Sequence, residues 1–224
     1  MACLKVPRDR ETAYEIRIRR HPEERSAPFL TLLCRHHRGR AKLYRSHLES
    51  VEAQLESFDR GLEHLTITGA TSVSEANHLL GNPRITRHLR GRYVMVLDDD
   101  DVFADPRAVR RLWDFVVPFP AIPWIMIKAR ISDRPGQTFP YPWGRDWRPR
   151  RGTIPSFSMV VKRQEYLRAQ RAWCSAKAAD WRFAQSLWSH GLRPRFLDTD
   201  HPLVHTLVVS HGKGERHAHS TRRA

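Results

Sequence analysis

The stretch Arg92-Tyr93-Val94-Met95-Val96-Leu97-Asp98-Asp99-Asp100-Asp101 joins an apolar run to four consecutive carboxylates. Such a short apolar run is typical of a strand buried on both faces. Four adjacent carboxylates repel one another unless a cation neutralises them, and ligands of open α/β sheets bind beyond the carboxyl ends of strands. Mg²⁺ and Mn²⁺ prefer carboxylate oxygens and often share their coordination with substrate phosphates. The stretch therefore predicts a metal site for a phosphorylated substrate; the alternative is a solvated acidic turn.

The composition is that of a globular protein with one main domain. The chain has 224 residues, of which 40% are hydrophobic and 28% charged, and this length can bury a core. No apolar run of about 18 residues predicts a transmembrane segment, and the N-terminus lacks the apolar region of a secretory signal. The three cysteines show no metal-binding spacing, so free thiols in a reducing compartment are expected. We therefore expect a cytoplasmic protein.

The net charge is +15, and arginine dominates it. Of the 39 Lys and Arg residues six are lysine, which leaves 33 arginines. Arginine suits phosphate groups, so the charge favours a nucleic acid, an anionic membrane surface or an anionic sugar nucleotide as partner; a coding bias toward arginine is the alternative. Because the basic residues are spread along the chain, we expect non-specific nucleic-acid binding at most. Peripheral contact with an anionic membrane surface stays open.

Composition and periodicity divide the chain into three parts. Residues 1–26 are predicted as a basic arm, although Tyr14 to Ile18 alternate as in a short strand; residues 27–210 form a catalytic domain and 211–224 a flexible His- and Arg-rich tail. Within the domain we expect strands at 29–34, 62–68, 93–97, 124–131, 157–161 and 193–197, and helices at about 44–55, 74–80, 106–115, 163–172 and 177–190. A loop rich in Pro, Trp and Arg spans 134–152. This alternation predicts an α/β sandwich with a mainly parallel central sheet flanked by helices.

Several short motifs follow one another in a recognisable order. A strand and an Arg-bearing loop, Phe29 to Arg38, precede a helix that ends with Leu48 to Gln54; then come 63–67, 76–77, the acidic run, 151–163 and finally Ala179-Asp180-Trp181. In this order, over about residues 27–205, the chain resembles the glycosyltransferase A fold and, within it, the family 2-like glycosyltransferases. The resemblance implies a nucleotide-sugar donor, an acceptor glycan, lipid or protein of unknown identity, and Mn²⁺ or Mg²⁺ as cofactor.

The resemblance also implies roles on the donor side. Asp98 and Asp100 match the family's Asp-X-Asp pair, and residues at i and i+2 of an extended segment share one side. The expected metal ligands are Asp98, Asp100, Asp101 and His205, with His211 as a rival of His205. The expected nucleotide-binding residues are Arg35, His36, Arg38, Asn77, Asp98 and Asp99, in which the arginines suit a diphosphate.

On the acceptor side the resemblance implies a general base on a helix. Asp180 stands where the family places its catalytic Asp, and a carboxylate can take the proton of an attacking hydroxyl. A single base with direct attack implies inversion at the anomeric carbon. Sugar and acceptor contacts are expected from Trp143, Gly152, Thr153 and Trp181; Trp147 and its neighbouring arginines belong to the same loop, where ordinary packing is the alternative.

One departure leaves the function open. The family commonly ends its second strand with an Asp pair that helps to hold the nucleotide, whereas this chain has Thr68 and Gly69. The donor base is therefore undefined. We expect a metal-dependent, hexosyltransferase-type enzyme; the alternatives are a basic nucleic-acid-binding protein and a non-catalytic nucleotide-binding member of the same fold.

Overall fold

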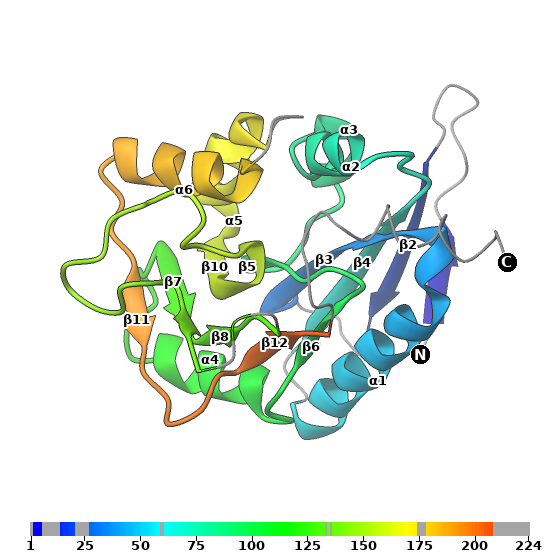
Figure 1. The fold of residues 1–224 in the computed structure, drawn as a ribbon. Coiled ribbons are helices and arrows are strands. Elements are labelled where there is room, and N and C mark those ends of the chain that lie inside the picture. The colour runs from blue at the N-terminus through cyan, green and yellow to red at the C-terminus, as the bar shows by residue number, and fades with distance from the viewer. Residues whose placement is uncertain are drawn as a thin grey trace, which may run out of the picture.

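The structure is a computed structural model that describes residues 2–5, 14–20, 27–58, 61–132, 134, 136–173 and 178–207, with the side chains of 2–5, Arg20 and Arg38 left out. Two sheets and the helices around them make up these residues (Figure 1). Part of the predicted arm and all of the predicted tail 211–224 lie outside the described residues.

The larger sheet has eight strands. Their spatial order is β1 (Ala2–Lys5), β2 (Glu15–Arg20), β4 (Leu62–Thr68), β3 (Leu30–His36), β5 (Tyr93–Val96), β10 (Met159–Lys162), β7 (Trp124–Ile127) and β11 (Arg195–Leu197). Strands β3, β4 and β5 pair in parallel, as do β7 and β11, whereas β2 and β10 run in the opposite direction. The predicted mainly parallel α/β sheet is therefore confirmed, and the carboxyl ends of β3, β4 and β5 meet at one edge.

The predicted basic arm supplies strands to this sheet. Strand β2 pairs antiparallel with β4, and β1 pairs with β2. Within β2 the side chains of Ile16 and Ile18 are buried while Arg17 is exposed. The alternation of apolar and charged residues explains this position, because every second side chain of a strand faces the core. Residues 15–20 are thus part of the folded sheet, and the description of them as an arm is corrected.

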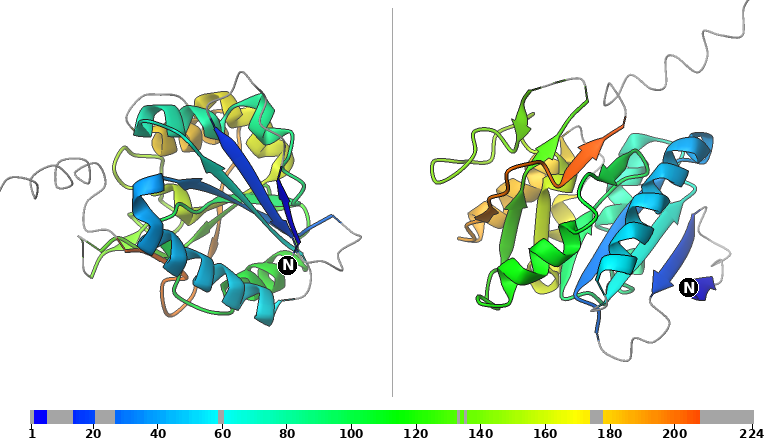
Figure 2. Two further views of the ribbon diagram at one scale, coloured as in Figure 1. Left: turned by 90° about the vertical axis from the view of Figure 1, so that its right-hand side faces the viewer. Right: turned by 90° about the horizontal axis from the view of Figure 1, so that it is seen from below.

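Helices cover both faces of the larger sheet (Figure 1). Helices α1 (Ala41–Ser57) and α4 (Ala108–Val116) lie side by side on one face, as the right-hand view of Figure 2 shows. The other face carries α2 (Val73–Leu80), α3 (Pro83–Thr86), α5 (Arg163–Ala169) and α6 (Ala179–Ser189). Strand β5 contributes side chains to the core on each face of the sheet. Tyr93 and Met95 pack in the core under α1 and α4, and Val94 and Val96 pack in the opposite core.

A second sheet of four short strands adjoins the first. Its order is β6 (Asp101–Phe103), β12 (Val204–Thr206), β8 (Ala129–Arg130) and β9 (Thr138–Phe139). The strand predicted over 124–131 is divided at Lys128, so that β7 belongs to the larger sheet and β8 to the smaller one. Strand β6 begins at the last Asp of the acidic run. The acidic run therefore forms one of the connections between the two sheets.

Among the described residues, no helix combines the length and the apolar character that crossing a membrane requires.

Candidate functional site

The acidic run folds as a turn after β5. The amide of Asp101 donates to the carbonyl of Asp98 at 3.0 Å, and the amide of Asp98 donates to a carboxylate oxygen of Asp101 at 3.1 Å. This turn corrects the expectation of an extended segment in which Asp98 and Asp100 share a side. It still gathers the predicted carboxylates, since ligand oxygens of Asp98, Asp100 and Asp101 all lie within 4.8 Å of one another.

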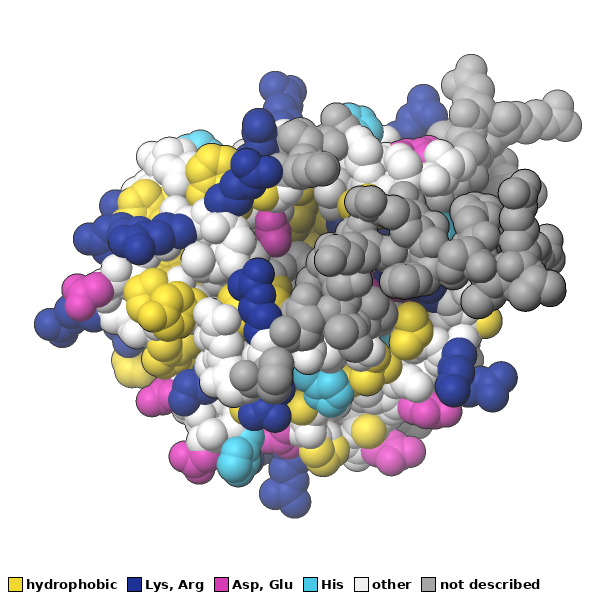
Figure 3. Space-filling view, viewed as in Figure 1, with side chains coloured by type: hydrophobic (Ala, Val, Ile, Leu, Met, Phe, Trp, Pro, Cys, Tyr) yellow, Lys and Arg dark blue, Asp and Glu magenta, His cyan; other side chains and the backbone are white. Residues whose placement is uncertain are grey.

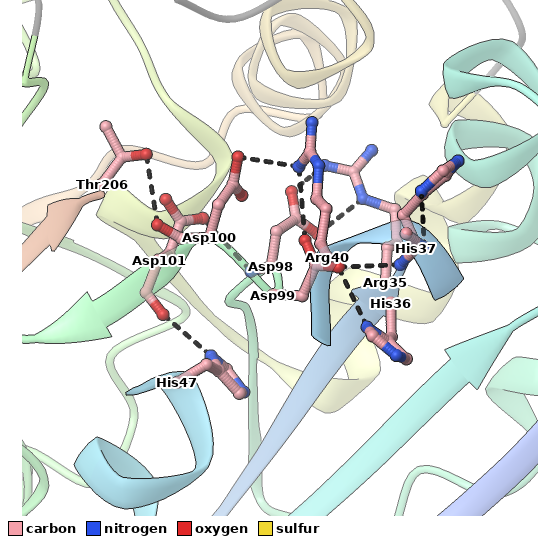
Figure 4. A network of polar contacts seen from close by, with 11 residues as sticks. Arg35, His36, His37, Arg40, His47, Asp98, Asp99, Asp100, Asp101 and Thr206 are labelled. Atoms are coloured by element: carbon pink, nitrogen blue, oxygen red, sulfur yellow. Dashed lines mark hydrogen bonds and ion pairs between the residues drawn. The ribbon is translucent and has the colours of Figure 1, made fainter. Parts of the chain in front are cut away.

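Two arginines of the chain neutralise much of this acidic turn (Figure 4). Arg35, at the end of β3, donates hydrogen bonds to both carboxylate oxygens of Asp98, and its Nε lies 2.6 Å from Oδ1. It also donates to the side-chain oxygen of Asn77 on α2. Arg40 Nη1 lies 2.9 Å from Asp100 Oδ2 and 3.3 Å from Asp99 Oδ1. Bidentate and charge-assisted contacts of this kind are the stronger hydrogen bonds of proteins. The two arginines therefore supply positive charge at the turn without a metal ion.

Asp99 points toward the loop that follows β3. Its carboxylate accepts from the backbone amide of His37 at 2.7 Å and from His36 Nδ1 at 3.0 Å. The side chain is 2% exposed. Asp99 thus ties the acidic turn to the end of the neighbouring strand, and His36 reaches the turn through it.

Asp101 is the carboxylate of the turn that no arginine of the described residues contacts by a hydrogen bond. Its side chain is buried, and its Oδ1 has no hydrogen-bond partner among the described residues. Burial, together with the charges of Asp100 and Asp98, raises the pKa of this carboxyl well above its usual range. A buried oxygen without a partner, next to two further carboxylates, offers the hard ligands that a divalent cation prefers. The residues present at the turn therefore fit a divalent cation.

A buried pair of histidines supports the turn from below. His47 on α1 donates from Nδ1 to the main-chain carbonyl of Asp101 at 2.8 Å, and its Nε2 lies 3.0 Å from Nε2 of His64 on β4. Neither histidine, nor Arg40, was singled out from the sequence. The position of Arg40 in the loop after β3 could have indicated its role, whereas no pattern in the sequence indicates that His47 and His64 meet.

The other donor-side residues predicted from the sequence are His205, Arg38 and His211. His205 lies on β12 opposite Val102 and is not among the three residues whose oxygens cluster; burial and the nearby Arg130 lower its pKa. Its neighbour Thr206 stands opposite Asp101 and donates from its hydroxyl to the carbonyl of Asp100 at 3.3 Å. The side chain of Arg38 and the whole of His211 lie outside the described residues.

On the acceptor side, Asp180 occupies the first turn of α6. Its Oδ1 accepts from the amide of Trp181 at 2.8 Å. The indole nitrogen of Trp181 donates to the carbonyl of Pro149 at 3.3 Å, which ties α6 to the long loop 134–152. The structure therefore joins Trp181, the neighbour of the predicted base, to the predicted sugar-binding loop.

Within that loop two tryptophans have different surroundings. Trp143 is partly buried, packs against Phe196 with ring centroids 4.9 Å apart, and has the Lys128 ammonium 5.5 Å from its ring centroid. Trp147 is 1% exposed and packs against Trp124 in the core. Trp147 is therefore a core residue and cannot offer a face to a sugar. Close by, the hydroxyl of Thr153 donates to the carbonyl of Arg150 at 2.8 Å, next to Gly152 in a left-handed conformation with φ 76°.

Comparison with known proteins gives a likeness in fold. No protein-family model matches the sequence, and no curated protein sequence matches it. Among solved structures, S. aureus TarS 1-349 superposes with a TM-score of 0.54 at 11% identity, over 79% of this chain and 60% of that one. A glycosyltransferase involved in the glycosylation of the major capsid of PBCV-1 superposes with a TM-score of 0.50 at 14% identity, over 86% of this chain and 98% of that one.

These two likenesses define the class of fold. The chain has the glycosyltransferase A-type α/β fold predicted from its sequence. It spans 60% of the length of the TarS fragment that it matches, and at identities of 11% and 14% the likeness extends to the fold alone.

Proposed function

We propose that this chain is a metal-dependent glycosyltransferase that moves a sugar from a nucleotide-sugar donor to an acceptor hydroxyl. The observation that carries the proposal is the acidic turn, where Asp98, Asp100 and Asp101 present clustered oxygens and Asp101 Oδ1 has no partner in the described part of the chain. The turn follows β5 directly, at the edge where ligands of such sheets bind. Asp100 and Asp101 would hold Mn²⁺ or Mg²⁺, with Asp98 beside them and His205 as a further proposed ligand. Bound there, the cation would stabilise the negative charge of the departing nucleoside diphosphate.

The chain's own residues complete the donor site in this proposal. Arg35, at the end of β3, orients Asp98 in the turn after β5 and Asn77 on α2. The side chain of Arg40 is 35% exposed, so that it can exchange a carboxylate for a phosphate oxygen. His36, Arg38 and Asp99 are proposed to line the nucleotide side of the same edge. Thr68 and Gly69 end β4 without a carboxylate, and the proposal therefore names no base.

Asp180 is proposed to take the proton of the attacking acceptor hydroxyl. One base acting on one direct attack gives inversion at the anomeric carbon. Trp143, Gly152, Thr153 and Trp181 are proposed to contact the sugar or the acceptor, since the Trp181–Pro149 hydrogen bond holds the loop next to Asp180. The proposed transfer moves a hexosyl group and takes place in the cytoplasm. The net charge of +15 also favours peripheral contact with an anionic membrane surface.

A thermal-shift screen of nucleoside diphosphates with and without Mn²⁺ tests the proposal. We expect at least one diphosphate to raise the melting temperature only when Mn²⁺ is present, and Asp100→Asn to abolish this response. Asp114→Asn is the matched control, because Asp114 is an exposed carboxylate on α4 that pairs with Arg110. No response to any diphosphate, or an unchanged response in Asp100→Asn, would contradict the metal assignment.

The net charge favours one other candidate, a nucleic-acid-binding protein. On the face seen in Figure 3, however, Lys and Arg side chains lie apart rather than in one continuous patch. Non-specific binding to a polyanion weakens steeply with salt, because each phosphate contact releases about one counterion. A salt titration of DNA and of nucleoside diphosphate on the same protein separates the two. Tight, sequence-selective DNA binding at physiological salt with no diphosphate binding would reverse the ranking.

A further inference from the structure

A second group of metal-ligating side chains lies in the core beneath the acidic turn. Cys34 on β3, His47 on α1 and His64 on β4 each offer one ligand atom, and these atoms lie within 4.8 Å of one another. All three side chains are buried, with exposures of 0%, 0% and 1%. Figure 4 shows the ring of His47 below the turn, joined to Asp101. The group is separate from the oxygen ligands of the turn and has a different chemistry.

The hydrogen bonds of the two histidines define their tautomers. A carbonyl oxygen only accepts, so Nδ1 of His47 must donate to Asp101, and Nε2 of His47 then carries a lone pair. Nε2 of His64 must in turn donate to Nε2 of His47 across 3.0 Å. This leaves the lone pair on Nδ1 of His64, which is buried without a partner among the described residues. Nδ1 of His64 can therefore take up the proton that lies between the two Nε2 atoms when an ion binds there.

The surroundings of His47 are those of a metal-binding histidine. Such a histidine usually donates its second ring N–H to a carboxylate or a backbone carbonyl, which orients the other nitrogen toward the ion. His47 makes this contact with the carbonyl of Asp101. Two nitrogens bound at zinc distances in a tetrahedral site lie about 3.3 Å apart, close to the 3.0 Å that separates the two Nε2 atoms.

We propose that Cys34, His47 and His64 form a second metal site, which takes a thiophilic divalent ion such as Zn²⁺. Thiolate and imidazole ligands favour this class of ion, whereas the carboxylates of the turn favour Mg²⁺ or Mn²⁺. The bound ion would link α1 to β3 and β4, and through His47 it would hold the main-chain carbonyl of Asp101 from below. The role is structural and does not depend on the proposed enzymatic function.

Occupation of the site moves two protons. Burial raises the pKa of the Cys34 thiol, so the sulfur is protonated until an ion displaces that proton to solvent. The proton on Nε2 of His64 moves to its Nδ1 when Nε2 binds the ion. Each ion taken up therefore releases one proton.

Cobalt absorption of a protein with a single thiol tests the site. In the full chain carrying Cys3→Ser and Cys174→Ser, Cys34 is the only cysteine. We expect added Co²⁺ to produce a thiolate-to-cobalt charge-transfer absorption that saturates at one ion per chain and is bleached by Zn²⁺. Because this absorption requires sulfur, the carboxylates of the turn and the histidines of 211–224 do not contribute to it.

Substitutions in the same background assign the nitrogen ligands. His47→Gln and His64→Gln should each weaken Co²⁺ binding by at least about tenfold, whereas the exposed His190→Gln and the acidic-turn variant Asp100→Asn should leave it unchanged. If the single-thiol protein is folded by circular dichroism and shows no charge-transfer absorption, the proposal is overturned. An absorption that neither histidine variant weakens would also overturn it.

Discussion

The acidic turn and the start of α6 hold their carboxylates in different ways. At the turn, Arg35 and Arg40 contact Asp98, Asp99 and Asp100, and the buried Oδ1 of Asp101 has no hydrogen-bond partner among the described residues. At α6, Asp180 accepts from the backbone of its own neighbour, Trp181. The turn joins its carboxylates to two guanidinium groups, whereas Asp180 lies in the first turn of a helix and accepts from a backbone amide there.

This difference indicates what each region can do. Positive charge within the protein already neutralises most of the turn, so a metal ion there would act through Asp100 and Asp101 and would not be needed to keep the four carboxylates together. Asp180 lies on another element, in the first turn of α6, and is the proposed proton acceptor. The comparison therefore sets the proposed donor-binding region apart from the proposed proton-accepting residue, and the following substitutions test that separation.

The largest effect is expected for Asp101→Asn. Removal of the Asp101 carboxylate, whose Oδ1 has no partner among the residues that the structure describes, should weaken Mn²⁺-dependent binding of nucleoside diphosphate by about 100-fold or more. Asp98→Asn should have a smaller effect because Arg35 holds Asp98. Isothermal titration calorimetry with and without Mn²⁺ measures both. Equal losses in the two variants would remove the distinction between Asp101 and the arginine-paired carboxylates.

Asp180→Asn should separate binding from transfer. We expect the transfer rate to fall by about 10²-fold or more, the scale of general-base catalysis, with unchanged affinity for the donor. Steady-state transfer assays and calorimetry on the same preparation measure the two effects, and Asp114→Asn serves as the control. Wild-type turnover in Asp180→Asn would mean that another group takes the proton.

Substitution of Arg35 tests how far the turn depends on its internal cations. Arg35→Lys keeps the charge and loses the bidentate contact with Asp98, so the free energy of unfolding should fall by about 2 kcal/mol. The exposed pair of Arg110 and Asp114 on α4 is the comparison, and Arg110→Lys should change stability by less than about 0.5 kcal/mol. Urea denaturation measures both; equal changes would show that the turn does not rely on Arg35 geometry.

The smallest effect per residue concerns the two histidines below the turn. Burial lowers the pKa of His47 and, more strongly, that of His64. Below the ordinary histidine pKa of about 6.5, the unfolded chain therefore binds more protons than the folded protein does. The free energy that these histidines contribute to stability is fully present above that pH and is lost as the pH falls toward the folded-state pKa values. At pH 5.5 the loss is up to about 1.4 kcal/mol for each histidine.

Urea denaturation of metal-free protein between pH 7.5 and 5.5 measures this decline. His64→Gln should show a smaller decline, because one of the two buried groups no longer titrates. A decline of the same size in the wild type and in His64→Gln would place the pH dependence elsewhere.

The sequence by itself determined the layers of the fold and the position of the carboxylates. Alternation in β5 sends Tyr93 and Met95 to one core and Val94 and Val96 to the other, because successive side chains of a strand point to opposite faces. The same rule places the isoleucines of β2 in the sheet. Since the acidic run follows β5 immediately, its location at the carboxyl edge was predictable from chain order alone.

Only the tertiary structure decided which charges meet. Arg35 and Asp98 are 63 residues apart, and His47 and His64 are 17 residues apart on different elements; no periodicity encodes such pairs. Strands as short as β6 and β12 form because they pair with each other, and Trp147 is buried because Trp124 packs against it. Local pattern sets the direction of each side chain, whereas its partner depends on strand register and helix packing, which arise only when the whole sheet has assembled.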